Sequence, residues 1–433
     1  MKAKAKGKTG EVSRREFITG TTAGALAALG LGASKAFAAG SDKIRVGLIG
    51  CGDRGLYDTT NCLKSSENVE LVAMGDVFQD HIDKCLAELS RTVDDKVSVS
   101  KDMSFVGFDA YKKVLASDVG LVILTTPPHF RAEHLKAAVE AGKHVFMEKP
   151  VAVDPAGVRS VIATSEAAEA KGLTIMAGTQ MRRIAHLVAA MKRIHNGDIG
   201  DITAGWCVRI GESMMNWWGP KIRQQEWTDM EWQLRRWLFY TWLSGDFIVE
   251  QHIHNLDIMN WAIGAHPVQC MGTGGREVRI GPEFGDVYDH FSVEYEYPNG
   301  VRVGYIGAQI DGCTVRCDQR LAGTKGTAYL DFGNAVIEGK KPFKYEGEIP
   351  DPCIQQHRDQ IAAIREGKAL NEGRRVAEST LTAIMGRMSA YTGRALSWDW
   401  VMNASKLDLT PATYEFGDLP ERPVAVPGKT ELV

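Results

Sequence analysis

The sequence predicts an α/β protein made of an N-terminal doubly wound domain and a C-terminal α+β domain, and three observations support this. Between residues 43 and 177, short runs rich in Val, Ile and Leu alternate with helical patterns, which is typical of a parallel sheet covered on both faces. After about residue 201, paired strands of alternating polarity replace this pattern, and Pro298-Asn299-Gly300 supplies a turn between two of them. The 433 residues are enough for two hydrophobic cores.

The expected elements follow in chain order. Buried parallel strands are expected at residues 44–50, 69–76, 119–127, 143–150 and 173–178, because each run is apolar almost without interruption. Late amphipathic helices are expected at about Ile354 to Glu366 and Arg374 to Thr392, and the Pro-rich end predicts an extended arm. The resulting division is a leader at 1–39, a first domain at 40–180, a second at 181–400 and a C-terminal arm at 401–433.

The leader has the features of an export signal. It combines a basic start, the run Ser13-Arg14-Arg15-Glu16-Phe17, a weakly apolar stretch and the small-residue site Ala36-Phe37-Ala38. It resembles a twin-arginine signal, which implies passage through the twin-arginine export machinery to the periplasm or another extracytoplasmic space. A short basic tail is the alternative. A stable membrane anchor is not expected, because the apolar run is too short and too rich in Gly, Ala and Thr.

The net charge limits the classes of ligand, and the export route bears on the state of the cysteines. Positions 1–38 hold seven Lys or Arg and two Glu, so 44 basic and 52 acidic residues follow them, a net charge of −8. An acidic chain without basic runs argues against nucleic acid and favours small ligands. Twin-arginine substrates cross the membrane after folding in a reducing compartment, so we expect the eight cysteines to be free thiols that are mostly buried.

A glycine loop and an acid predict dinucleotide binding. Gly50, Gly52 and Gly55 have G-x-G-x-x-G spacing between an apolar strand and a helix, the pattern by which a Rossmann domain cradles a pyrophosphate at a helix N-terminus. Asp76 ends the next strand, where a carboxylate accepts hydrogen bonds from ribose hydroxyls and repels a 2′-phosphate. NAD is therefore expected as the cofactor, with NADP less favoured. Further contacts with the dinucleotide are expected from Asp53, Arg54, Thr126, Pro127 and Glu148.

The motif Glu148-Lys149-Pro150 carries a family resemblance. In a Rossmann domain, this tripeptide at a strand end resembles the signature of the glucose-fructose oxidoreductase, inositol dehydrogenase and rhizopine-catabolism (Gfo/Idh/MocA) family, and the similarity spans residues 43 to about 395. The resemblance implies that Lys149 bonds the reacting hydroxyl of the substrate and lies beside the nicotinamide. It also implies that the second domain has a large, mostly antiparallel open sheet through which family members form homo-oligomers.

A second cluster supplies the expected proton acceptor. If residues 244–261 form one helix, Glu250, His254 and Asp257 share a face. This stretch resembles the family's D-x-G-x-H-x-x-D motif, which implies that His254 is the general base and that Glu250 lies in the substrate site. A near-neutral pKa would suit that role. Glu250 and His252 replace the family's usual Asp and small residue, so they bear on the identity of the substrate.

Two other interpretations of this cluster remain open. Glu250, His252 and His254 could bind a metal, although histidines two apart on a helix diverge, and no metal is expected. His254 could instead be a packing residue of the core.

Further substrate contacts are expected near this cluster. Seven of the ten tryptophans fall between residues 206 and 242; most should lie in the core, while Trp217 and Trp218 could stack on a sugar ring. Arg182, Arg183, His252 and Asp257 complete the candidate substrate residues.

Together these patterns predict an exported NAD-dependent oxidoreductase that acts on a hydroxyl of a sugar or sugar derivative. Because no free nicotinamide pool is maintained outside the cytoplasm, the cofactor should be tightly bound and recycled. One alternative is an NAD-dependent glycosidase that works by oxidation, elimination, hydration and reduction. A second is a non-catalytic sugar-binding protein.

Overall fold

The N-terminal part is a doubly wound domain, as predicted. The computed structural model describes residues 42–213 and 222–433. Its first sheet has the strand order β3-β2-β1-β4-β5-β6, and all its pairs are parallel. The strands are β1 (Ile44–Ile49), β2 (Val69–Asp76), β3 (Ser104–Val106), β4 (Leu121–Leu124), β5 (His144–Met147) and β6 (Ile175–Ala177). This is the strand order of a Rossmann domain.

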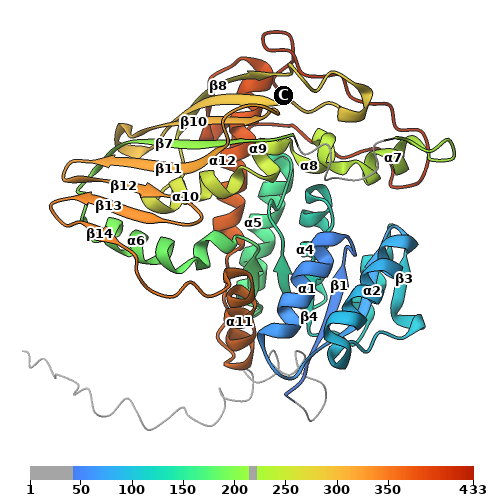
Figure 1. Cartoon of the computed structure of the whole chain (residues 1–433). Helices are drawn as coiled ribbons and strands as arrows, with labels where there is room; N and C mark the ends of the chain where they lie inside the picture. The colour runs from blue at the N-terminus through green and yellow to red at the C-terminus, as the bar shows by residue number, and fades with distance from the viewer. Residues whose placement is uncertain (1–41, 214–221) are drawn as a thin grey trace, which may run out of the picture.

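Helices cover both faces of this sheet (Figure 1). They are α1 (Asp53–Ser65), α2 (Gln79–Val93), α3 (Ala110–Ala116), α4 (Arg131–Glu140) and α5 (Pro155–Ala170). A sixth helix, α11 (Pro352–Arg365), comes from late in the chain: the Gln360 amide donates to the Val145 carbonyl at 2.8 Å, and Ile361 and Ile364 join the core of the sheet. The first domain is therefore completed by residues far from it in sequence.

The second part contains a nine-stranded sheet with the order β14-β13-β12-β11-β7-β10-β9-β8-β15. Its strands are β7 (Ile202–Gly211), β8 (Gln269–Gly275), β9 (His290–Glu296), β10 (Arg302–Gln309), β11 (Arg316–Gly323), β12 (Gly326–Leu330), β13 (Ala335–Gly339), β14 (Phe343–Lys344) and β15 (Leu396–Ser397). Among the described strand pairs of this second sheet, only β7 and β10 are parallel, so the sheet is mostly antiparallel, as the resemblance implied.

The predicted hairpin joins β9 to β10. Asn299 and Gly300 both have positive φ, 66° and 76°, as a tight turn between twisted strands requires. Along β9, Phe291 and Val293 are buried while Glu294 is exposed. This alternation gives the sheet one apolar face toward the helices and one face toward solvent.

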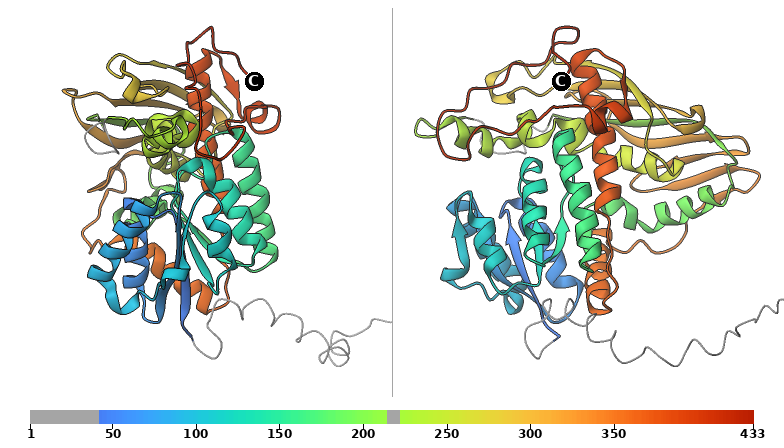
Figure 2. Two further views of the ribbon diagram at one scale, coloured as in Figure 1. Left: turned by 90° about the vertical axis from the view of Figure 1, so that its right-hand side faces the viewer. Right: turned by 180° about the vertical axis from the view of Figure 1, so that it is seen from behind.

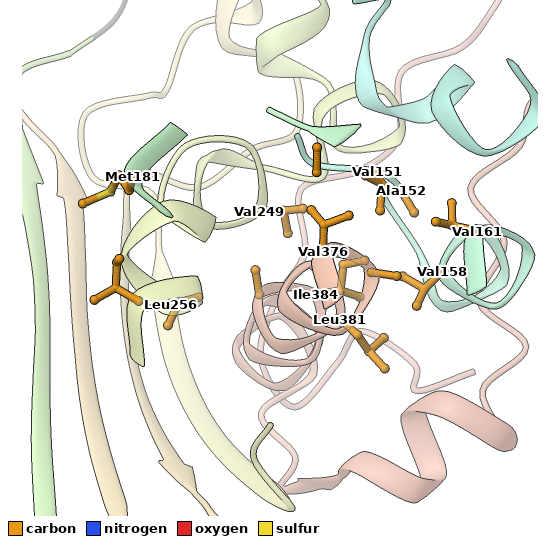
Figure 3. Packing of buried hydrophobic residues seen from close by; sticks show 14 of the residues in the cluster. Val151, Ala152, Val158, Val161, Met181, Val249, Leu256, Val376, Leu381 and Ile384 are labelled. Carbon is orange, nitrogen blue, oxygen red and sulfur yellow. The ribbon is translucent and has the colours of Figure 1, made fainter. Parts of the chain in front are cut away.

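The helices that contact the strands of this sheet are α6 (Ala185–His195), α10 (Ile253–Ile263), α12 (Gly373–Thr392) and α13 (Trp398–Asn403). The other helices of this part are α7 (Asp229–Arg235), α8 (Thr241–Ser244) and α9 (Phe247–Glu250). The long helix α12 lies between the sheet and the first domain (Figures 1 and 2). In Figure 3, its Val376 and Ile384 face Val158 of α5 and Val249 of α9. One continuous core therefore joins the two domains.

The stretch expected as one helix around His254 is two helices. The chain leaves α9 after Glu250, and the His252 amide donates to the Phe247 carbonyl, five residues back, at 3.0 Å. A wide turn of this kind breaks the 3.6-residue repeat. The face predicted to hold Glu250, His254 and Asp257 together is therefore not that of a continuous helix.

The remaining expectations concern cysteines, helices and the arm. All eight cysteines are free thiols, and only Cys313 and Cys317 are not buried. Within the described ranges, no helix combines the length and the apolar character needed to cross a bilayer. The predicted helices at 354–366 and 374–392 correspond to α11 and α12. Residues 401–403 finish α13, and residues 404–433 of the expected C-terminal arm contain no helix or strand and turn at 427–429.

Candidate active site

The glycine loop between β1 and α1 has the geometry of a pyrophosphate cradle. Gly50 has φ +96°, and a Cβ there would lie 2.5 Å from the Thr126 amide nitrogen. A Cβ on Gly55 would lie 2.0 Å from the Gly50 carbonyl oxygen. At Gly52, in contrast, a Cβ would meet no atom within 4 Å. The first and third glycines are thus required by the fold, and the second faces open space.

Helix α1 presents its N-terminus to that space. Gly52 is its N-cap, with no side chain bonded to the first amides, so these N–H groups and the helix dipole can receive an anion. The Asp53 side chain, a predicted cofactor contact, instead pairs with Lys84 at 2.8 Å on the exposed surface. Only the backbone of Asp53 lies at the cradle.

Asp76 ends β2 beside the loop. Its carboxylate accepts from the Cys51 amide at 2.6 Å and the Phe78 amide at 2.9 Å, which fixes it next to the glycines. A pocket extends from here, and it is lined by Gly50, Gly52, Asp76, Thr126, Pro127 and residues of the loops after β2, β3 and β4. Five predicted cofactor residues therefore share one pocket. The open cradle, the helix N-terminus and the carboxylate fit a dinucleotide.

Lys149 is held next to the end of β5 by the second domain. Its Nζ donates to the Glu250 carbonyl at 2.5 Å and to Glu250 Oε1 at 2.9 Å, and both side chains are about nine-tenths buried. The pairing brings together two predicted catalytic residues that are 101 positions apart. A nearly buried ammonium is thereby fixed at the carboxyl end of the parallel sheet, where open α/β sheets bind ligands.

Glu148 connects this lysine to the glycine loop. One carboxylate oxygen accepts from the Arg54 guanidinium, and the other accepts from the Lys149 amide at 3.0 Å. Arg54 also donates to Asp58 on α1 at 3.0 Å. Arg54 and Glu148, both predicted cofactor residues, therefore form an ion pair that locks α1 onto the end of β5.

His254 lies in this buried environment as a neutral base. Burial, aided by the positive charges of Lys149 and Arg209, lowers the pKa of His254 well below its ordinary value. The near-neutral pKa expected from sequence is therefore wrong in this setting, because desolvation disfavours the imidazolium. The buried Nδ1 atom of His254 has no hydrogen-bond partner among the described residues.

Two predicted substrate residues serve the fold instead. His252 is 1% exposed, and its Nδ1 lies 2.6 Å from the Tyr305 hydroxyl in the core. Asp257 is also 1% exposed; it forms two bonds of 2.7 and 2.9 Å with Arg182 and accepts from Ser379 at 2.6 Å. The expectation that these side chains touch substrate does not fit, because both residues are buried and bonded to core residues.

The predicted arginines lie in a different hollow. Arg182 is bound to Asp257, and Arg183 pairs with Glu372 at 2.8 Å. Both line a surface depression with residues of α6 and α11, apart from the glycine-loop pocket. The structure therefore gives them ion-pair partners rather than open contact with the pocket.

The tryptophans of this stretch that the structure describes are mostly buried or partly buried, as expected. Trp232 and Trp242 are buried, Trp227 and Trp237 are partly buried in the same cluster, and Trp206 is 54% exposed on the outer face of β7. Trp217 and Trp218 lie outside the described residues, as does the predicted leader. In residues 42–213 and 222–433, no group of three His, Cys, Asp or Glu is placed to hold a metal.

Sequence reasoning missed three charged residues around the site. Asp58 is buried beside Arg54, and burial and Glu148 raise its pKa; its spacing of four residues from Arg54 was an available signal. Arg131 is buried and donates to the Leu124 carbonyl at 2.9 Å. Arg209 of β7 donates to the Gln251 carbonyl at 2.8 Å and to Asn255 at 3.2 Å, across the break between α9 and α10. No local pattern marks Arg131 or Arg209.

Comparison with known proteins agrees with this geometry. Residues 44–179 match the oxidoreductase family with an NAD-binding Rossmann fold, and residues 187–329 match the GFO/IDH/MocA C-terminal domain. Two curated relatives are a 2,7-anhydro-N-acetylneuraminate hydratase of Escherichia coli, 28% identical over 47% of this chain and 50% of that protein, and an inositol 2-dehydrogenase of Serratia proteamaculans, 26% identical over 68% and 75%.

The solved structures add a fold-level likeness. An aldose-aldose oxidoreductase from Caulobacter crescentus aligns with a TM-score of 0.63 and 19% identity, over 82% of this chain and 99% of that one. The chain spans about half the length of the first curated relatives that it matches. Both family domains are present in order, and together they cover more than half of the sequence. The chain therefore belongs to the Gfo/Idh/MocA oxidoreductase family.

Proposed function

We propose that this chain is an exported NAD-dependent oxidoreductase that acts on a hydroxyl of a sugar or sugar derivative and keeps its cofactor bound. The observation that carries the proposal is the Lys149 ammonium, which Glu250 holds next to the end of β5 beside the neutral His254. A salt bridge from Glu148 to Arg54 ties this group to the glycine loop. Cofactor cradle and acid–base residues thus form one connected site.

The residues divide the chemistry as follows. When bound, the nicotinamide would accept and later return a hydride. Lys149 stabilises negative charge that develops on the reacting oxygen, which a preorganised ammonium does well in a site of low dielectric. His254 is uncharged, so its free nitrogen can accept the hydroxyl proton. Glu250 fixes the position of the ammonium through two contacts.

The preference for NAD over NADP rests on Asp76. Its carboxylate lies at the end of β2 with both oxygens bonded to backbone amides, so it stays in place beside the position of the adenosine ribose. A fixed negative charge there repels a 2′-phosphate.

Export and cofactor retention are linked in this proposal. The Arg14-Arg15 motif and the small-residue site after it support the twin-arginine route and a periplasmic location. A protein there has no maintained nicotinamide pool to draw on, so the dinucleotide must fold into the chain before export. The cofactor must then be regenerated on the enzyme, for example by oxidising one sugar and reducing another.

Self-association through the second sheet is part of the same proposal. The outward face of that sheet exposes large apolar side chains at Trp206, Met271 and Ile306. Exposed apolar groups of this kind on one sheet face are typical of protein interfaces. A homo-oligomer would cover them.

A redox-neutral lyase or glycosidase reaction is the second candidate. The observation that favours it is the similarity to a protein described as a hydratase of an anhydro sugar. Oxidation next to a carbon–hydrogen bond acidifies that bond, so a leaving group one carbon further can be eliminated, water added and the hydride returned. The same Lys149 and His254 would serve the first and last steps.

One preparation tests both candidates. The exported protein is purified, denatured, and any released nucleotide is identified; it is then mixed with a panel of sugars and glycosides while the reduced-nicotinamide absorbance is followed. Net reduction of the cofactor supports the oxidoreductase, and cleavage without net reduction supports the second candidate. A protein with no bound nucleotide and no uptake of added NAD would refute both and leave the sugar-binding alternative.

A further inference from the structure

The outer wall of the dinucleotide pocket is aromatic. Phe78, Phe108 and Phe130 line it from the loops after β2, β3 and β4. Phe78 follows Asp76 by two residues, so this wall stands at the end of the pocket where the Rossmann pattern places the adenosine. Residues that pack behind this wall therefore affect how readily that end of the pocket opens.

The support comes from the far C-terminus of the chain. The Phe416 ring stacks on Phe78 with centroids 5.9 Å apart and also lies 5.3 Å from Phe108. The Tyr414 ring lies 5.5 Å from Phe130, and its hydroxyl is 2.7 Å from His129 Nε2. Two arm residues therefore pack behind all three wall residues.

The arm is tied to both domains on either side of these rings. Before them, the Leu409 amide donates to Asp154 of the first domain at 2.8 Å. After them, the Gly417 carbonyl accepts from the Met230 amide at 3.1 Å, and the Leu419 carbonyl accepts from Gln233 at 2.6 Å, both in α7. Figure 2 shows the dark-red arm running beside α7. Residues 409–419, here called the strap, thus cross the cleft between the domains.

The second domain adds to the same cover. Leu234 and Trp237 line the pocket directly. The Arg235 guanidinium lies 3.9 Å from the centroid of the Phe78 ring and pairs with Asp80 at 3.0 Å. Phe78 therefore contacts both Arg235 of the second domain and Phe416 of the strap.

The centre of the strap is weakly held. Thr413 and Glu415 are exposed, and Phe416 itself is 45% exposed. Segments with few buried contacts open at a lower free energy than the elements they cover. The anchored ends and the lightly packed centre allow the strap to lift without unfolding either domain.

We propose that the strap retains the dinucleotide: the adenosine end leaves the pocket only when Tyr414 and Phe416 lift off the aromatic wall, so the strap sets the dissociation rate. This inference rests on the proposed function, because it requires that the pocket binds a dinucleotide. It supplies the physical device by which an exported member of this family would keep its cofactor.

The test measures release of NADH from the purified full-length protein. The protein is loaded with NADH, mixed rapidly with excess NAD, and the loss of NADH fluorescence gives the release rate. Three proteins are compared with wild type: Tyr414→Ala with Phe416→Ala, Phe416→Ala alone, and Glu415→Ala as the matched control, since Glu415 is exposed between the two rings. Thermal unfolding without nucleotide shows whether each variant remains folded.

We expect the double variant to release NADH at least about tenfold faster, since each lost aromatic contact accounts for a several-fold change. Phe416→Ala should release it a few-fold faster and Glu415→Ala at the wild-type rate. Because Phe416 is half exposed, the single variant should fold even if the double variant does not. An unchanged NADH release rate from folded Phe416→Ala would overturn the proposal that the strap retains the dinucleotide. Wild-type protein that binds no NADH would instead overturn the proposed function.

Discussion

Replacing Gly52 by alanine should separate dinucleotide binding from folding. Gly52 has φ −72° and ψ −175°, which any residue adopts, and a Cβ there would meet no atom within 4 Å. The variant should therefore fold with nearly unchanged stability, because the gain of about 0.4–1 kcal/mol through the unfolded chain is offset by the weaker preference of alanine for the N-cap position.

Binding should fall because the methyl group enters the space that faces the start of α1. A pyrophosphate would be pushed away from the helix amides, and loss of one hydrogen bond to a charged group costs about 1.5–3 kcal/mol. That corresponds to an affinity for NADH that is about 10- to 100-fold weaker. Fluorescence titration of stripped protein measures the affinity, and thermal unfolding without nucleotide measures the stability.

Gly50→Ala is the matched control within the same loop. Its φ of +96° disfavours alanine, and the new Cβ would lie 2.5 Å from the Thr126 amide nitrogen. This variant should lose stability as well as binding. If Gly52→Ala bound NADH as tightly as wild type, the phosphates would not lie against α1. If Gly52→Ala lost as much stability as Gly50→Ala, the inference that a Cβ at Gly52 enters open space would be wrong.

Three further predictions concern the site and the core. Lys149→Met should lower turnover about 100- to 1,000-fold while nucleotide stays bound, and wild-type turnover would remove Lys149 from the chemistry. Asp257→Asn should reduce the free energy of unfolding in urea by about 3–5 kcal/mol, because it removes the buried carboxylate that pairs with Arg182, whose side chain is only 13% exposed. Glu294→Gln, in an exposed pair, is the control and should change it by less than about 1 kcal/mol. Burial lowers the pKa of His129 and of His144 to about 4 from 6.5. Their contribution to stability is complete above pH 6.5 and is lost toward pH 4, because only the unfolded chain takes up these protons in that window, at about 1.4 kcal/mol per pH unit each. Chemical denaturation at several pH values should show a shallower slope for His144→Gln, and an identical slope would refute this.

The parallel sheet could be predicted because its strands are marked by composition. Strands buried on both faces are almost purely apolar, as β1 and β4 are, and no tertiary information is needed to see them. Strand β3 was missed because its three residues, Ser104 to Val106, are not buried. An edge strand of that length carries neither an apolar run nor an alternation.

The parts of the candidate site that could be predicted are those whose expected role depends on backbone geometry or on a position at a strand end. The roles of Gly50 and Gly52 follow from turn geometry, and Lys149 follows from its place after β5. Asp257 was assigned to substrate from its place on an expected helix face, and His252 from its place in the stretch that resembles the family motif. Neither the spacing nor the motif says what a side chain meets in the fold. The break at His252 and a partner for Asp257 at Arg182, 75 positions away, are set by tertiary packing.

The same limit explains the C-terminal arm. Its prolines predict an extended chain, and the structure shows a segment without helix or strand that also turns at 427–429. No local sequence pattern indicates that Phe416 contacts Phe78, because the two residues are far apart in sequence and come together only when both domains are folded.

The structure also links the proposed cofactor cradle to the proposed catalytic lysine. The Glu148 carboxylate accepts from Arg54 of α1 and from the Lys149 amide at once, so one group fixes both the start of the cradle helix and the backbone of the lysine. A Cβ at position 178 would lie 2.1 Å from Glu148 Oε1, so this carboxylate can keep its place only because Gly178 has no side chain. A shift of α1 on nucleotide binding would therefore be transmitted through Arg54 and Glu148 to Lys149. In the proposed function, these contacts would therefore couple cofactor binding to the placement of the Lys149 ammonium.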